Sequence, residues 1–278
     1  MTPDSWRAPA ADASRPPARR PFKGVFPALV LIAWCVIVPA QPEVAAGGGL
    51  HSVGQSFSVK QGGRVVVSNP YGNVRIRAVP LAATPELRVI MQTEPEVARP
   101  AELRVESLED GVRLSIDAIA EGRLSEQQGF LRADFVIALP DRFALEVEMI
   151  DGSFTMHPAS YPLRLRARDA RVNLRTTGAL DVELLAGRVV VQQGGGSEPI
   201  SGGRIQTSRA AVDVLGADLA RVNYATLSGA AVTTDSAALL ESRVHDGRGY
   251  RFVGDPNNPV LSIQTDEAPI RLVVEGIR

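Results

Sequence analysis

The sequence predicts an all-β fold, and three observations support this prediction. Apolar and polar residues alternate along many short segments, for example in "LRLRARDARVNLRTTGALDVELLAGRVVVQ" at residues 163–192. Glycine, proline and small polar residues separate these segments and mark turns. No part of the chain after residue 40 carries apolar residues at helical spacing over three turns. Alternation with a period of two is typical of strands with one buried face, so we expect strands throughout.

The expected strands begin at residue 56, and we predict one domain over residues 56–277. The segment "RVVVSNPYGNVRIRA" at residues 64–78 predicts two strands around a Pro-Tyr-Gly turn. Its candidate core residues are Val65, Val67, Val74 and Ile76. Further strands are expected at "ELRVIMQT", "AELRVES", "VRLSIDA" and "ADFVIALP".

The alternation becomes a repeat over residues 143–235, where the domain is most regular. Leu145, Leu163 and Leu180 align at offsets of 18 and then 17 residues. The same offsets align three further sets: Val147, Leu165 and Val182; Phe154, Val172 and Val189; and Met156, Leu174 and Val191. After the insertion "GGGSEPISG", Ile205 continues the Val182 column, Val212 and Val214 continue the second strand, and residues 221–224 follow residues 204–207 at an offset of 17.

A repeat of this length is one supersecondary unit of two short strands, and it cannot bury its apolar face alone. Successive units must therefore stack, which predicts a β-helix-like solenoid that adds a layer of strands about every 4.8 Å. An antiparallel meander is the structural alternative. It gives no reason for equal offsets in both halves of three units.

Two stretches carry a resemblance to a known family: "VVVSNPYGNVRIRA" and "FVIALPDRFALEVEMIDGSF". They resemble the opening strand, turn and strand, and the Leu-Pro segment, of the putative adhesin domain family of bacterial envelope proteins, which is related to the head domains of some autotransporter adhesins. With the short repeats, the resemblance covers about residues 56–277. It implies a right-handed β-solenoid in an exported protein, with irregular strands at its N-terminal end, and it brings no catalytic residues. The insertion and the last units depart from the regular pattern.

The first forty residues predict export. Basic residues precede an apolar run over residues 25–38, and "VPA" before Gln41 supplies the small residues that signal peptidase accepts. We expect a signal peptide over residues 1–40 that is cleaved near Gln41. An uncleaved signal anchor is the alternative, in which residues 25–38 tether the protein to the membrane, although this run is short for a span of about 20 residues.

Residues 41–55 lack hydrophobic periodicity and predict a flexible tether. The one cysteine, Cys35, lies in the apolar run before the expected cleavage point. The exported product would therefore have no disulfide, and packing and backbone hydrogen bonds would stabilise it in the periplasm, the cell envelope or the extracellular space.

The composition narrows the choice of partners. The formal net charge is −1 and the isoelectric point is near 6.3, so the chain as a whole does not attract nucleic acid or anionic lipid. Aromatic residues make up 5% of the chain, which is little for sugar-stacking platforms. We expect a glycan, an envelope component or a protein as partner, and no nucleic acid.

The repeat alignment places charged residues in two outward columns. One column holds Glu146, Arg164 and Asp181, and the other holds Glu148, Arg166 and Glu183. Opposite charges on adjacent strands stabilise a sheet weakly, and here they reinforce the register because a slip of one residue would turn them inward. We predict a charge ladder at these six residues, which are also our candidate surface for binding.

Eight arginines could form a basic surface for anionic glycans: Arg64, Arg75, Arg77, Arg164, Arg166, Arg171, Arg175 and Arg188. The alternative is a solvated face on which these arginines pair with acidic residues of neighbouring units. Alternation of the two signs along the repeat favours the paired arrangement.

No metal or cofactor site is expected. The three histidines, His51, His157 and His245, are far apart in sequence and have no ligand pattern around them. Four aspartates fall at expected turns and could collect calcium if they stacked: Asp151, Asp169, Asp246 and Asp266. Aspartate also favours turns through local hydrogen bonds, and this second explanation is preferred.

These observations favour a non-enzymatic, exported cell-envelope or adhesion-type module that binds a surface partner. The alternative is a polysaccharide hydrolase or lyase on the same scaffold, with a carboxylate pair such as Asp181 and Glu183. Two carboxylates separated by one residue are common on any solvated strand. The sequence also has no nucleophile elbow, phosphate loop or dinucleotide fingerprint, so we expect no enzyme and no catalytic residues.

Overall fold

The computed structural model describes residues 49–60, 62–93, 102–116, 130–140, 143–193, 199–245, 247 and 249–274. Within these residues the regular structure is one open sheet of 16 strands together with one five-residue helix. The all-β class predicted from alternation is therefore confirmed. The expected signal peptide at residues 1–40, including Cys35, lies outside the described residues, as does the first part of the expected tether.

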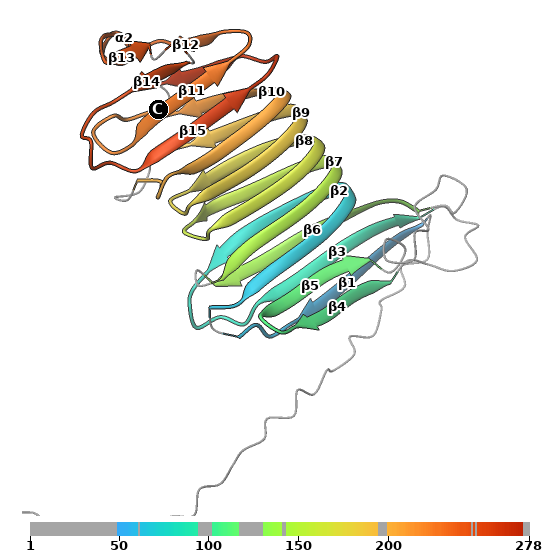
Figure 1. Cartoon of the computed structure of the whole chain (residues 1–278). Coiled ribbons are helices and arrows are strands. Elements are labelled where there is room, and N and C mark those ends of the chain that lie inside the picture. Colours follow the sequence, from blue (N-terminus) through green and yellow to red (C-terminus); the bar gives the residue numbers. More distant parts are fainter. Residues whose placement is uncertain are drawn as a thin grey trace, which may run out of the picture. The chain divides into compact units, whose positions relative to one another are not determined.

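Five long strands form the middle of the sheet and pair in parallel with one another (Figure 1). In spatial order they are β2 (Arg64–Val79), β7 (Ala144–Ala159), β8 (Leu163–Thr176), β9 (Leu180–Gln192) and β10 (Gly203–Leu215). The pairing follows the predicted columns: Val147 lies opposite Leu165, and Leu165 opposite Val182. The predicted register of the repeat is confirmed from β7 to β10.

Each long strand bends back on itself. Straight parallel strands need a crossover of a dozen or more residues between them. Here only residues 160–162 join β7 to β8, and such a connection reaches roughly 15 Å at most. A straight strand with the 14 residues of β8 would be about 46 Å long. The end of each strand must therefore return near its beginning, so every long strand has a first half and a second half on either side of a bend.

Glycine occupies the bend where neighbouring backbones come closest. Gly152 of β7 has a φ of 140°, which L side chains rarely adopt, and it lies opposite Gly72 of β2. A Cβ atom at Gly152 would lie 1.8 Å from the carbonyl oxygen of Gly72. The Asp-Gly turn of the sequence is thus required by backbone packing between two strands.

The core lies between the two halves of the stacked strands. Its columns contain the predicted apolar residues, and Val65, Val67, Val74 and Ile76 are fully buried. Two columns run through the stack: Val67, Val147, Leu165, Val182 and Ile205 in the first halves; Val74, Phe154, Val172, Val189 and Val212 in the second halves. Each buried side chain of this kind contributes about 1.5 to 3 kcal/mol, so burial of these columns favours stacking.

At the N-terminal end, two separate strands complete the layer below β2. β5 (Gly111–Ile116) pairs with the first half of β2, and β6 (Phe130–Pro140) pairs with the second half. Antiparallel strands extend both: β4 (Leu103–Leu108) pairs with β5, and β3 (Glu86–Thr93) pairs with β6.

The predicted tether at residues 41–55 extends too far. Residues 50–56 form β1 (Leu50–Ser56), which pairs with β3 from Leu50 to Ser56. The side chains of this edge strand alternate between exposed and half-buried, and Val53 is the one apolar residue on its half-buried side. Backbone pairing holds β1 in place, which a search for hydrophobic alternation does not detect.

At the C-terminal end, the predicted alignment of residues 221–224 with 204–207 is wrong. The late strand β15 (Val260–Thr265) lies between β10 and β11 (Asn223–Ser228), so that Leu261 faces Gly203 on one side and Tyr224 on the other. All these strands show the same alternation. The alternation of apolar and polar residues therefore does not determine which strand pairs with the free edge of β10.

The remaining elements finish this end of the sheet. β16 (Ile270–Val273) lies between the second half of β10 and β12 (Val232–Thr234). The antiparallel strands β14 (Tyr250–Phe252) and β13 (Arg243–His245) follow β11, and the helix α2 (Ala237–Glu241) is capped by Ser236. No helix within the described ranges is long and apolar enough to cross a membrane.

Candidate binding surfaces

The stack presents two outer faces, one on each half of the bent strands. The ladder face consists of the outward residues of the first halves, including the six predicted ladder residues. The arginine face consists of the outward residues of the second halves. Its basic residues are Arg75, Arg77, His157, Arg171, Arg175 and Arg188.

The ladder face has the predicted register. Glu146 lies opposite Arg164, which lies opposite Asp181. In the second column, Arg166 lies between Glu148 and Glu183. Two of these neighbours form ion pairs: Arg164 Nε lies 3.6 Å from Asp181 Oδ2, and Arg166 Nε lies 3.3 Å from Glu183 Oε2. The ladder register is therefore observed, whereas a binding role for these residues stays a prediction.

Two arginines outside the six candidates extend the ladder. Arg204 Nη2 lies 2.9 Å from Asp181 Oδ1 and 3.0 Å from Glu183 Oε1, and the hydrogen bond to Asp181 raises the pKa of Arg204 above its ordinary value. Arg64 Nη1 lies 3.2 Å from Glu146 Oε2. The alignment that places Ile205 opposite Val182 also places Arg204 opposite Asp181, so this contact could have been predicted from the sequence.

The ladder face satisfies its own charges. Asp181 and Glu183, the carboxylates considered for polysaccharide cleavage, are held by Arg164, Arg166 and Arg204. Such exposed pairs contribute little to stability, and they place both carboxylates against arginines of neighbouring strands. The geometry gives the enzyme alternative no support at this pair.

The eight arginines considered as a basic surface divide between the two faces. Arg64, Arg164 and Arg166 belong to the paired ladder. On the arginine face, Arg188 Nη2 lies 2.7 Å from Asp213 Oδ2. The other four have no ion pair with any described residue: Arg75, Arg77, Arg171 and Arg175. The expectation of paired arginines holds for the ladder face and fails for most of the arginine face.

Unpaired positive charge is therefore concentrated on the arginine face, although the formal net charge of the chain is only −1. The second halves of the five long strands carry five outward arginines and one carboxylate, Asp213. Neighbouring strands are about 4.8 Å apart, so the arginines of β2 and those of β8 are separated by about 10 Å across β7. This spacing creates a local positive field that the overall charge conceals.

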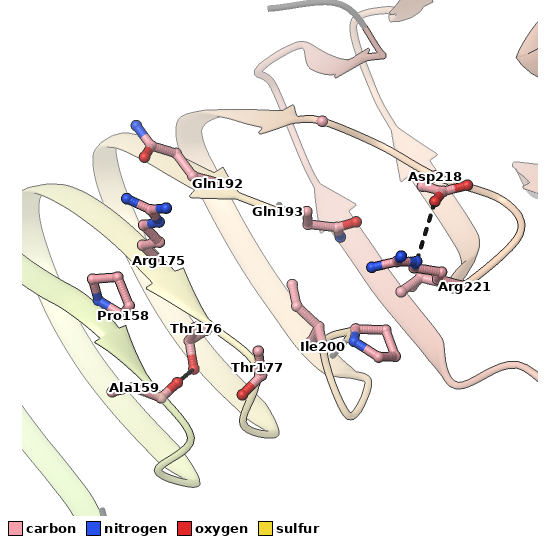
Figure 2. Close-up of a pocket in the computed structure, with 13 residues that line it drawn as sticks. Pro158, Ala159, Arg175, Thr176, Thr177, Gln192, Gln193, Ile200, Asp218 and Arg221 are labelled. Atoms are coloured by element: carbon pink, nitrogen blue, oxygen red, sulfur yellow. Dashed lines mark hydrogen bonds and ion pairs between the residues drawn. The ribbon is translucent and has the colours of Figure 1, made fainter. Parts of the chain in front are cut away.

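A hollow of about 160 Å³ lies where the second halves of β7, β8 and β9 end (Figure 2). Its polar lining includes Arg175, Thr177, Gln193, Asp218 and Arg221, and Figure 2 shows Gln193 between Arg175 on one side and Arg221 on the other. Apolar lining comes from Pro158, Ile200 and Val222. Arg175 thus belongs both to the hollow and to the arginine face.

The amide of Gln193 is oriented by a buried tyrosine. Tyr224 Oη donates a hydrogen bond to Gln193 Oε1 at 2.7 Å and accepts one from the backbone N–H of Asp218 at 3.2 Å. Burial raises the pKa of Tyr224 to about 12, so the hydroxyl keeps its proton at physiological pH. Because that single proton requires an acceptor, the oxygen of the Gln193 amide must face Tyr224.

This orientation leaves the Gln193 nitrogen without a partner. Nε2 is buried and has no acceptor among the described residues. A buried donor without an acceptor costs about 1 to 3 kcal/mol, and such groups are rare in native structures. The other polar side chains of the lining differ: Thr176 Oγ1 donates to the carbonyl of Ala159, and Arg221 Nε lies 3.6 Å from Asp218 Oδ2.

The other residues considered from the sequence do not form a site. His51, His157 and His245 lie on β1, β7 and β13. Asp151 lies opposite Asp169 at the bend, Asp266 follows β15, and Asp246 is outside the described residues. Within the described part of the chain, no group of three or more metal-ligating side chains occurs.

No family model matches the chain, and no curated protein matches it. Among solved structures, it is similar to a "putative cell adhesion protein" from Clostridium sporogenes, at 14% identity and a TM-score of 0.39, over 84% of this chain and 99% of that one. It is also similar to a "putative adhesin" from Bacteroides fragilis, at 12% identity and a TM-score of 0.33, over 80% of this chain and 96% of that one. A "putative adhesin" from Parabacteroides merdae is similar at 7% identity and a TM-score of 0.32, over 82% of this chain and 97% of that one.

Similarities at this level establish neither a shared family nor a shared ligand. Membership of the putative adhesin domain family, and the relation to autotransporter head domains, therefore stay predictions from the quoted sequence motifs. The hollow was not anticipated from the sequence, because it combines the ends of three repeat units with residues 218–222. The offset of 17 residues places Arg175 opposite Gln192, which carries no charge, and this is the only feature of the site that the repeat contains.

Proposed function

We propose that the chain is a non-enzymatic, exported cell-envelope or adhesion-type module, built as a right-handed β-solenoid, that holds a surface partner against its arginine face. One observation carries this proposal: the ladder face satisfies its own charges, whereas the arginine face keeps four arginines without ion pairs next to a hollow. Arginines of this kind are available for a partner. A face with paired charges serves mainly to fix the register of the strands.

The stacked strands suit binding by many modest contacts. Parallel pairing in register and three-residue connections support a coil in which each layer repeats the same outward positions about 4.8 Å from the last. A repetitive partner can meet several layers at once, and several copies of the protein on one surface would raise the overall strength of binding. The motifs of the first forty residues support export to such a surface.

The proposal is tested by offering the purified chain a panel of envelope polysaccharides and surface glycans, with and without calcium. Retention on the solid phase is measured together with new reducing or unsaturated chain ends. We expect retention without product. Product formation that disappears in Asp181→Asn or Glu183→Gln variants would overturn the proposal in favour of a hydrolase or lyase.

A further inference from the structure

We propose that the hollow binds one carboxylate-bearing sugar unit of an acidic polysaccharide, and that neighbouring acidic units of the same polymer lie along the arginine face. This inference rests on the proposed binding function and assigns its ligand class. The size of the hollow, its unpaired donors and the row of basic residues that leads away from it support this ligand class.

The size of the hollow fits a single ring. Its volume of about 160 Å³ is close to the roughly 150 Å³ of an engineered protein cavity that holds benzene, and it is well below the roughly 300 Å³ at which typical ligand pockets begin. One six-membered sugar ring is therefore the natural occupant. The rest of a polymer would have to lie on the open surface outside.

The donors at the hollow call for an anionic acceptor. Gln193 lines the hollow and its buried Nε2 has no hydrogen-bond partner among the described residues, and the Arg175 guanidinium has no carboxylate partner among them. A carboxylate accepts several hydrogen bonds and matches the forked donors of arginine. A neutral sugar would supply acceptors for Gln193 but would leave the charge of Arg175 without a counter-charge.

The one carboxylate in the lining does not oppose an anion strongly. The Asp218 carboxylate accepts a hydrogen bond from the backbone N–H of Ala220 at 2.9 Å. It also forms an ion pair with Arg221, which lines the hollow beside it. Its negative charge is therefore partly neutralised where it lies. The apolar residues Pro158 and Ile200 complete the wall and can contact the C–H face of a sugar ring.

A row of two arginines and one histidine continues from the hollow toward the N-terminal strands. Arg175 lies on β8, His157 on the adjacent strand β7 and Arg77 on β2, so the strands that carry Arg77 and Arg175 are about 10 Å apart. A wider hollow of about 650 Å³ follows between β1, β3, β6, β2 and β7, and its charged or basic lining consists of Arg75, Arg77, Arg88, His157 and one carboxylate, Glu86. A linear polymer with repeated carboxylates can therefore meet cations over several strands.

The arginine face lacks the groups that a nucleic acid would need. Single-stranded nucleic acids are held by aromatic side chains on which bases stack. The described outward residues of the second halves from β2 to β9 include no phenylalanine, tyrosine or tryptophan. The face offers charge and hydrogen bonds at regular spacing, which suits an acidic polysaccharide better.

Two substitutions test the assignment on the full purified chain. Polygalacturonate is the acidic probe, dextran the neutral probe and dextran sulfate the probe for unspecific charge. Arg175→Gln removes the cation at the hollow. Gln193→Glu keeps an acceptor for Tyr224 and replaces the unpaired N–H groups with a second acceptor. Since hydrogen bonds to charged groups are among the strongest, each variant should weaken polygalacturonate binding about tenfold or more.

Arg113→Gln is the matched control. It removes the same charge from an exposed position on β5, away from the hollow, and should change binding by less than about twofold. Thermal unfolding of all variants checks that they are folded. If Arg175→Gln proves unstable, Gln193→Glu decides the question alone.

The outcomes separate this inference from the proposed function. Polygalacturonate binding that Arg175→Gln and Gln193→Glu weaken and Arg113→Gln does not supports the inference. Equal weakening by all three variants, or equal retention of dextran sulfate, shows unspecific charge only and overturns the hollow as a site. Retention of dextran alone, unaffected by the variants, overturns the inference while the binding function stands. If the full glycan panel is not retained either, both proposals fail.

Discussion

The hydroxyl of Tyr224 on β11 and the side-chain oxygen of Gln193, the first residue after β9, are joined by a 2.7 Å hydrogen bond. β10 and the late strand β15 lie between these two strands in the sheet. The contact therefore links the C-terminal end of the stack to the hollow. It also decides which way the Gln193 amide points, and thus whether the hollow offers a donor or an acceptor.

Tyr224→Phe should change the pH dependence of stability. The folded-state pKa of about 12 lies above the unfolded value of about 10, so the folded state keeps a proton that the unfolded state releases. The resulting stabilisation is complete below pH 10 and is lost as the pH rises toward 12. It amounts to on the order of 2 kcal/mol. Urea unfolding at pH 8, 10 and 11 should show a steeper loss of stability in the wild type than in Tyr224→Phe.

Tyr71→Phe provides the control for this measurement. Tyr71 is half-buried on β2 and has no side-chain hydrogen bond to the described residues. Its variant shows what the loss of a tyrosine hydroxyl outside any described hydrogen bond does to the same unfolding curves. Parallel curves for Tyr224→Phe and the wild type would contradict the assignment of a buried, protonated Tyr224.

Gly152→Ala should destabilise the fold strongly. The added Cβ atom would meet the carbonyl oxygen of Gly72 at 1.8 Å, and the φ of 140° is strained for alanine. Strain and displacement of the neighbouring backbone together should cost about 3 kcal/mol or more. The change is measured as a lower midpoint of urea unfolding.

Gly54→Ala is the matched substitution for comparison. A Cβ atom at Gly54 on the edge strand β1 has no heavy atom within 4 Å. We expect a change in unfolding free energy of less than about 0.5 kcal/mol. Equal effects of the two substitutions would mean that the bend at Gly152 is not closely packed.

The insertion of β15 beside β10 can be tested by cross-linking. Arg204 lies opposite Ser262 on adjacent strands, at the roughly 5 Å between Cα atoms that a disulfide accepts. In a Cys35→Ser background, Arg204→Cys with Ser262→Cys should therefore form a disulfide on mild oxidation. Arg204→Cys with Arg221→Cys, the pair that the simple repeat predicts, should stay reduced. Mass spectrometry after thiol labelling distinguishes the two results, and the reverse pattern would restore the sequential order of strands.

The middle of the fold could be read from the sequence because each layer repeats the same columns. Leu165 and Val182 face each other as their offset of 17 predicts, and so do Arg166 and Glu183. The order of strands at the C-terminal end could not be read in this way. Leu261 and Tyr224 occupy equivalent positions in alternating strands, and only the complete packing decides which of them lies nearer to Gly203.

The candidate site was predictable to a smaller extent. Sequence alternation identified Arg175 as outward and charged, but it favoured pairing with acidic neighbours. The neighbour of Arg175 in the next layer is Gln192, which cannot neutralise it. The unpaired amide of Gln193 depends on Tyr224, and no local pattern connects those two residues. Sites formed by strand ends and distant turns therefore require the structure.

Ligand length should separate the hollow from the rest of the arginine face. Arg175 contacts the unit in the hollow, whereas Arg77 lies about 10 Å away on β2 and can contact only a neighbouring unit of a longer chain. Arg77→Gln should therefore weaken binding of polygalacturonate severalfold and leave the much weaker binding of monomeric galacturonate unchanged, whereas Arg175→Gln should weaken both. Affinities for monomer, short oligomers and polymer are measured by calorimetry at one ionic strength, since screening reduces all these contacts. Equal losses for monomer and polymer in Arg77→Gln would place Arg77 at the same subsite as Arg175. An unchanged polymer affinity would instead confine the ligand to the hollow and exclude the extended path across β7.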